Sequence, residues 1–185
     1  MSEPLDMRAQ VAMALAPHAQ GCPHVATIMR YLASDQAKGW YDSAFHQRRG
    51  SRWSPAGGLA QAFMTAYKAL RILEKCCDAL YGPVQIDRAV MCLAVIMLSR
   101  WADLRDGKLT QVEAGEHRAH GSMITTSLSN LMALNITDCS TVELQVITCW
   151  YKSRAQMRED HEPFNALWWV MHQTFDLVYV VGEQG

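Results

Sequence analysis

Cationic and aromatic side chains are interleaved along residues 38–53, which read KGWYDSAFHQRRGSRW. The segment has four cations and one carboxylate, whereas the whole chain has a formal charge of −1. Arginines neutralise phosphates and aromatic rings stack on unpaired bases, but Trp, Tyr and Arg are also the usual energetic centres of protein interfaces. We therefore expect a surface that binds another protein or nucleic acid, the alternative being a loop whose rings pack inward. The residues assigned to this surface are Lys38, Trp40, Tyr41, Arg48, Arg49, Arg52 and Trp53.

The adjacent tryptophans Trp168 and Trp169 are a second candidate for binding. Neighbouring residues of a helix point about 100° apart, so both rings are buried only where other elements cover a wide arc. Either this helix is deeply embedded, or Trp169 contributes to a partner surface. The chain also contains 11 methionines and six tryptophans, and both residue types are over-represented at interfaces.

Two carboxylates and two imidazoles lie at helical spacing between residues 113 and 120. Glu113, Glu116, His117 and His120 would share one stripe of a helix and could ligate a divalent metal. Their order matches neither H-E-x-x-H nor the paired Glu-x-x-His of di-iron bundles. Ordinary i, i+4 pairs on a solvated face are the favoured interpretation, and no metal or cofactor is expected.

No familiar catalytic motif accompanies these residues. G-x-S-x-G, G-x-x-x-x-G-K-[ST] and C-x-x-C are all absent, and no catalytic residue is assigned. Cys139 precedes an expected helix start and is the thiol best placed for a lowered pKa. The sequence favours a non-enzymatic regulatory or adaptor protein that binds another protein or a second copy of itself. A nucleic-acid-binding regulator using residues 38–53 and a metal-dependent helical enzyme using residues 113–120 are the alternatives.

The elements that position these residues are helices. None of the six prolines interrupts a hydrophobic periodicity, as expected where proline marks helix ends. Residues 89–98, AVMCLAVIML, are apolar on every face and predict a buried central helix over residues 84–106. We expect an all-α, irregular bundle of about seven helices around it, in a single domain spanning residues 1–185. Residues 177–181, LVYVV, fit either a terminal strand or a helix end. The expected helices span about 3–16, 23–39, 55–82, 84–106, 111–134 and 141–159, with a last one opening at Pro163.

The composition limits the setting in which the protein acts. The longest apolar stretch is ten residues, whereas a membrane-spanning helix needs about 20. The first ten residues, MSEPLDMRAQ, lack the basic start and apolar middle of a secretory signal. We therefore expect a cytoplasmic protein that does not enter membranes. Its 17 basic and 18 acidic side chains argue against a general polyanion binder.

Overall fold

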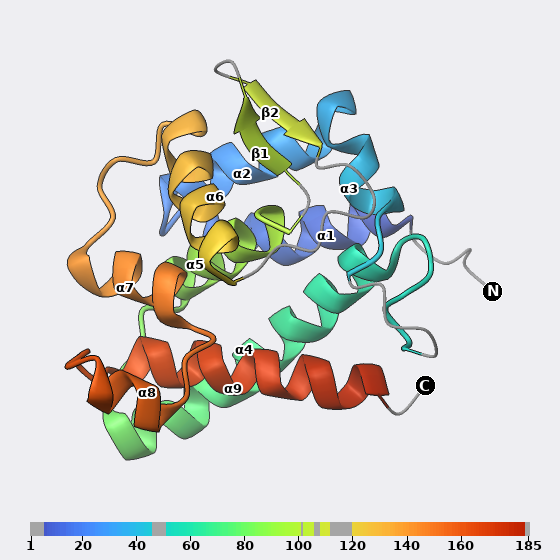
Figure 1. Cartoon of the computed structure of the whole chain (residues 1–185). Helices are drawn as coiled ribbons and strands as arrows, with labels where there is room; N and C mark the ends of the chain where they lie inside the picture. Colours follow the sequence, from blue (N-terminus) through green and yellow to red (C-terminus); the bar gives the residue numbers. More distant parts are fainter. Residues whose placement is uncertain (1–5, 46–50, 101, 106–107, 112–119, 184–185) are drawn as a thin grey trace.

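Helix α5, Ile86–Leu98, lies at the centre of the molecule, as the sequence predicts (Figure 1). In the computed structural model no residue from 89 to 98 is more than 3% exposed. The helix contacts α2, α4, α6, α7 and α9, which surround it. A helix without a polar face must be covered on all sides, so the other helices are arranged around α5.

The structure describes residues 6–45, 51–100, 102–105, 108–111 and 120–183, and within 102–111 and 120–125 only the backbone. Nine α-helices lie in these ranges, which confirms the all-α bundle, and one small β-hairpin accompanies them. The other helices are α1 Met7–Leu15, α2 Pro23–Ala33, α3 Lys38–Asp42, α4 Gly58–Tyr81, α6 His120–Ala133, α7 Thr141–Cys149, α8 Arg154–Glu159 and α9 Ala166–Glu183. Two single 3₁₀ turns, Ala16–His18 and Asp35–Ala37, follow α1 and α2.

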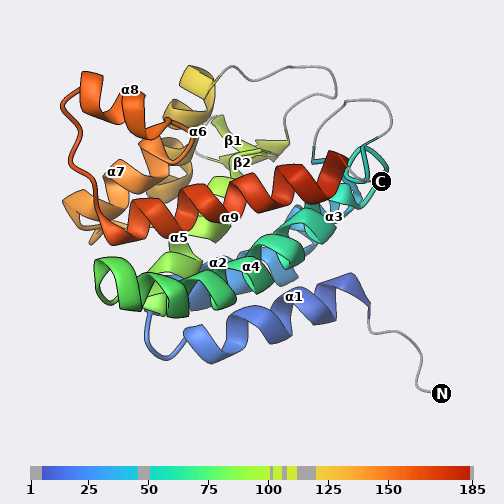
Figure 2. The same ribbon diagram turned by 90° about the horizontal axis from the view of Figure 1, so that it is seen from below.

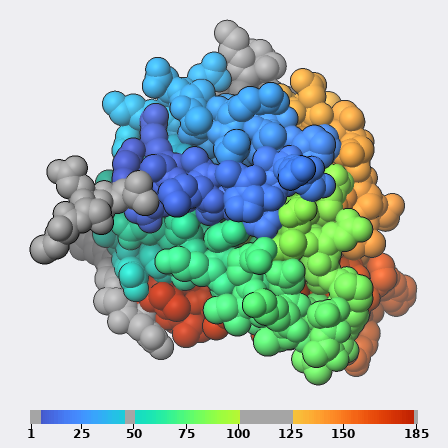
Figure 3. Space-filling view, turned by 180° about the vertical axis from the view of Figure 1, so that it is seen from behind, coloured from blue at the N-terminus to red at the C-terminus, as the bar shows by residue number. Residues whose placement is uncertain are grey.

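The two longest helices, α4 and α9, pack side by side with opposite directions (Figures 1 and 2). The end of α4 therefore lies beside the start of α9, and the start of α4 beside the end of α9. Helix α1 contacts α2 and α4 and crosses the back of the molecule at its surface (Figure 3). Helices α6 and α7 cover another side of α5. In the described part of the chain, no helix combines the length and apolarity needed to cross a membrane.

The predicted central helix is wrong beyond Leu98. Its expected continuation forms strand β1, Ala102–Arg105, which pairs antiparallel with β2, Lys108–Gln111. Arg105 pairs with Lys108, and the two intervening residues, Asp106 and Gly107, have the sequence typical of a two-residue hairpin connection. The ladder supplies backbone hydrogen bonds in place of helical ones. The helix expected over about 111–134 begins at His120 in the described chain.

Several other boundaries also differ from the prediction. Asp6 caps α1, and residues 3–5 of the helix expected over about 3–16 lie outside the described residues. Helix α4 starts at Gly58 rather than Pro55, because Gly57, with a φ of 81°, is not helical. A capping box at Ser153 starts α8, so the helix expected over 141–159 is divided into two.

Residues 177–181, for which a strand was the alternative, are helical and lie inside α9. The helix expected over 23–39 ends at Ala33, and α3 follows as a separate short helix.

Candidate functional site

The tryptophans of residues 38–53 lie in the core, not at a contact surface. Trp40 and Trp53 are each 1% exposed. The Trp40 ring packs edge-on against Phe63 with 5.8 Å between ring centres, and its indole nitrogen lies 3.5 Å from the carbonyl oxygen of Met97. Both rings are therefore out of reach of a ligand on the surface. For Trp40 and Trp53 the alternative prediction, rings that pack inward, is therefore confirmed. Each indole N–H donates to a backbone carbonyl inside the fold.

The remaining residues of this segment are separated from one another. Lys38 and Arg52 are exposed, and the Arg52 guanidinium carbon lies 5.2 Å from the centre of the Trp53 ring. Tyr41 is half-buried on α3. Arg48 and Arg49 lie outside the described residues. The described rings of this segment thus offer no row of exposed faces on which unpaired bases could stack.

The proposed metal stripe falls largely outside the described chain. Glu113, Glu116 and His117 are not described, and His120 is described only through its backbone, as the first residue of α6. Among the side chains that the structure does describe, no group of three His, Cys, Asp or Glu residues is placed to hold a metal ion. The 113–120 site stays a prediction.

Exposed aromatic rings gather where α4 ends and α9 begins. We call Tyr81, Phe164, Trp169 and Arg154 the aromatic cluster. The ring centre of Tyr81 lies 5.3 Å from that of Phe164 and 5.1 Å from that of Trp169. The guanidinium carbon of Arg154 lies 4.8 Å from the centre of the Phe164 ring. Tyr81 is 41% exposed, Phe164 is 37% exposed and Trp169 is half-buried.

Local structure fixes the position of each ring in the aromatic cluster. Tyr81 is the last residue of α4, and Trp169 lies near the start of the antiparallel α9. Phe164 precedes α9 and stands next to Asn165, whose side-chain oxygen accepts a 2.7 Å hydrogen bond from the Trp168 amide. The first backbone amides of a helix have no acceptor within the helix, and this bond provides one of them with a partner. It also holds the chain before α9 in place.

The two adjacent tryptophans of α9 have different environments. Trp168 is buried, and its indole nitrogen donates a 3.1 Å hydrogen bond to the Cys149 carbonyl. Trp169 remains partly exposed beside Tyr81. The sequence prediction assigned Trp169, but not Tyr81, Phe164 or Arg154, to a binding surface. The helix expected from Pro163 starts three residues later, at Ala166, so Phe164 lies before it.

A buried ion pair joins α5 to α7. Arg88 Nη2 donates a 2.7 Å hydrogen bond to Glu143 Oε2, and Arg88 Nε bonds the second carboxylate oxygen. The Ser140 amide and hydroxyl also donate to Glu143. Burial opposes ionisation of Glu143, but the hydrogen bonds from Arg88 and Ser140 hold its pKa below the ordinary value. This arrangement stabilises the packing of α5 against α7.

A cleft of about 590 Å³ opens beside this ion pair. The residues that precede α5, α7 and α9, namely Gln85, Ser140 and Asn165, all line it. Helix starts attract anions, yet Asp138 and Glu143 place two carboxylates on the same walls, and we assign no anion site here.

The Cys139 thiol does not have the lowered pKa that the sequence predicts. Burial, followed in size by the negative charge of Glu143, raises its pKa to about 11. The expected lowering at a helix start is therefore wrong, because desolvation of the thiolate outweighs the attraction of the helix N-terminus.

Comparisons with protein-family models, with curated proteins and with solved structures find no match for this chain.

Proposed function

We propose that this chain is a regulatory or adaptor protein that binds another protein through the aromatic cluster. The observation that carries the proposal is the contact between Tyr81, Phe164 and Trp169 at the surface, with Arg154 over Phe164. Tryptophan, tyrosine and arginine are the residue types that most often dominate binding energy, and they do so when they cluster. All three types meet in this one cluster.

The rings form a continuous apolar surface. Tyr81 contacts both Phe164 and Trp169, and Tyr81 and Phe164 are exposed. Single exposed apolar side chains are common, but contiguous ones mark a surface that gains free energy when a partner covers it. A partner that presents apolar side chains to the rings would remove this surface from water.

Charge narrows the chemistry of the partner. Arg154 is exposed and forms no ion pair with any described carboxylate. Its guanidinium stays charged in the physiological range and can bind a carboxylate through two parallel hydrogen bonds. We infer that the partner places an Asp or Glu beside its apolar contact residues.

The aromatic cluster is also well ordered before binding. Tyr81 contacts two rings at once, and Trp169 and Phe164 are positioned by the start of α9. Side chains that are already held in place lose less conformational entropy when a partner arrives. More of the interaction energy then appears as affinity.

The cysteines bear on the compartment. All six are free thiols, and four of them are buried: Cys22, Cys77, Cys92 and Cys149. Free thiols without disulfides are typical of a reducing compartment. We therefore propose that the protein acts in the cytoplasm, and this supports an intracellular protein as the partner.

Site-specific photo-crosslinking tests the proposal. Phe164 is replaced by p-benzoylphenylalanine in the native host, and Met132, a 71% exposed residue on α6, is replaced in the same way as the control. We expect a discrete adduct with a different protein from position 164 and none from position 132. The additional substitution Arg154→Glu should remove that adduct.

Three results would overturn the proposal. They are the absence of an adduct at position 164, the same adduct at position 132, and an adduct that persists after Arg154→Glu. An adduct with exactly twice the mass of the chain would show that the surface binds a second copy instead of another protein.

A further inference from the structure

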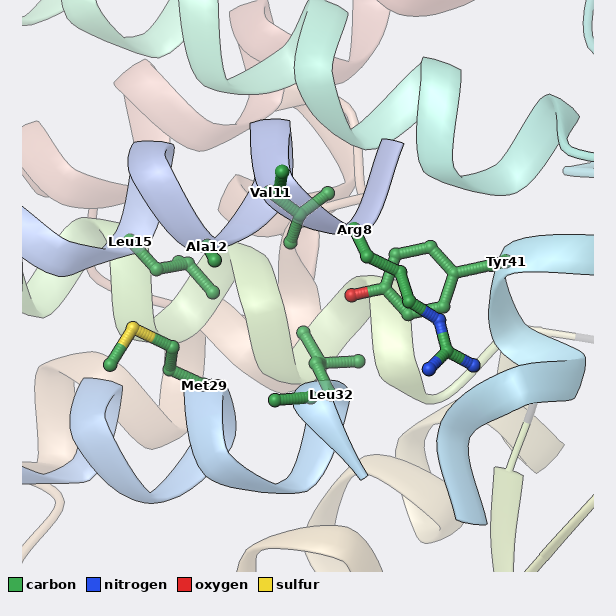
Figure 4. Close-up of a pocket in the computed structure, with 9 residues that line it drawn as sticks. Arg8, Val11, Ala12, Leu15, Met29, Leu32 and Tyr41 are labelled. Carbon is green, nitrogen blue, oxygen red and sulfur yellow. The ribbon is translucent and has the colours of Figure 1, made fainter. Parts of the chain in front are cut away.

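Helices α1 and α2 form the walls of an apolar cavity, partly open to solvent, on the side of the molecule seen in Figure 3. Its volume is about 240 Å³. Val11 and Leu15 from α1 face Met29 and Leu32 from α2 across it (Figure 4). Apolar walls of this kind gain free energy when a hydrocarbon covers them.

One end of the cavity carries polar groups. Tyr41 reaches in from α3, and its hydroxyl points toward the space between Val11 and Leu32 (Figure 4). Arg8 lies beside it, with the guanidinium carbon 5.1 Å from the centre of the Tyr41 ring. Neither the Arg8 guanidinium nor the Tyr41 hydroxyl bonds a described side chain. The cavity thus has apolar walls and, at one end, a cation with a hydrogen-bond donor.

Burial keeps Tyr41 in its donor form. Desolvation raises the pKa of Tyr41 to about 12; the nearby Arg8 charge acts in the opposite direction, and the Asp6 carboxylate at the start of α1 adds a smaller increase. The hydroxyl therefore carries its proton at every physiological pH. A group that always donates, next to a permanent positive charge, favours an anionic acceptor.

We propose that this cavity binds a free carboxylate with a single hydrocarbon chain of medium length. The chain fills the space between α1 and α2, and the carboxylate lies at the end formed by Arg8 and Tyr41. The volume exceeds what a benzene ring needs but is below the usual range for drug-sized ligands, about 300–1,000 Å³. One unbranched chain of roughly ten carbons suits this intermediate size. The planar guanidinium fork matches the geometry of a carboxylate.

This site is independent of the proposed protein contact. The cavity and the aromatic cluster share no residue, and they are formed by different helices. Failure of one proposal leaves the other standing. Binding of the small molecule is measured on the purified chain without a partner.

Three probes with the same ten-carbon chain separate charge from hydrophobicity. Decanoate, decanol and decyltrimethylammonium are titrated calorimetrically, each below the concentration at which it forms micelles. We expect decanoate to bind with a dissociation constant at least about tenfold lower than either of the others. Undetectable binding of decanoate, or equally tight binding of the ammonium compound, would overturn the proposal.

Substitutions then test the assigned residues. Arg8→Gln should weaken decanoate binding by about tenfold and leave decanol binding unchanged. Arg30→Gln removes an exposed arginine of α2 that does not line the cavity and should change neither. Ala12→Leu should fill the cavity and weaken both ligands, with circular dichroism confirming the fold. Decanoate binding that is unaffected by Arg8→Gln would refute the proposed site, whether or not the Ala12 variant folds.

Discussion

The indole nitrogen of Trp53 donates a 2.8 Å hydrogen bond to the backbone carbonyl of Val178, 125 residues further along the chain. The same ring packs so closely on α9 that a Cβ at Gly182 would lie 2.3 Å from it. The bond and the contact attach the segment before α4 to the end of α9. Trp53 is therefore a packing residue that fixes the relative position of the two longest helices.

The backbone around Trp53 also leaves no room at the start of α4. A Cβ at Gly58 would lie 2.1 Å from the Trp53 carbonyl oxygen, so Gly58→Ala forces the backbone apart. Alanine normally stabilises a helix by about 1 kcal/mol relative to glycine, whereas overpacking costs about 1–3 kcal/mol. We expect a net loss of about 1 kcal/mol in the free energy of unfolding, measured by urea denaturation. Gln61→Ala, at an exposed position of the same helix, should change it by less than about 0.5 kcal/mol. A Gly58→Ala protein as stable as the parent would contradict this packing.

The ion pair between Arg88 and Glu143 predicts a loss of stability in acid. The pKa of Glu143 is lowered in the folded state, so its contribution is complete above the ordinary carboxyl value of 4.5 and disappears as pH falls through the lower folded pKa. Glu143→Gln should therefore flatten the decrease in unfolding free energy below pH 4.5. At pH 7 it should cost about 1.5–3 kcal/mol, because the partly buried Arg88 loses its charged acceptor but keeps Asp138 as a neighbour.

Denaturation of the Glu143→Gln protein between pH 2 and pH 7 checks this expectation. Glu159→Gln, on the exposed surface of α8, serves as the control and should cost less than about 0.5 kcal/mol. An acid transition that is unchanged in Glu143→Gln would show that other groups determine it.

The thiols should react in a defined order. Cys76 is exposed on α4, whereas Cys22 and Cys92 are buried and Cys139 is half-buried with a pKa of about 11. At pH 8 only about one Cys139 in a thousand is a thiolate, the form that alkylates. We expect iodoacetamide to label Cys76 first, as followed by peptide mass spectrometry. Rapid labelling of a Cys76→Ser protein at position 139 would be inconsistent with a buried thiol.

The elements predicted correctly are those whose signal is local. Residues 89–98 predicted a buried helix because no arrangement with a polar face was open to them. Helix α7 starts at Thr141 as predicted, and Ser140 and Glu143 form a capping box there. The hairpin was missed because the expected central helix was extended to residue 106, although Asp106 and Gly107 have the sequence typical of a hairpin connection.

The candidate site depended on distant contacts and could be predicted only in part. Trp53 is buried by α9. It was assigned to a surface because cations and aromatic residues surround it in the sequence, and that pattern does not indicate which helix packs on the ring. Trp169, one of the candidates for a surface, is partly exposed, and Tyr81 lies beside it only because α4 and α9 run antiparallel. The pairing of these two helices brings together residues 88 positions apart, and no short sequence pattern specifies it.

Affinity for the crosslinked partner is the most direct test of the aromatic cluster. Once that partner is purified, its dissociation constant is measured for the parent chain, for Phe164→Ala and for Met132→Ala, with circular dichroism confirming that each is folded. We predict that Phe164→Ala raises the constant by at least about tenfold and that Met132→Ala changes it by less than about twofold. Equal constants for the parent chain and Phe164→Ala would contradict the proposed function.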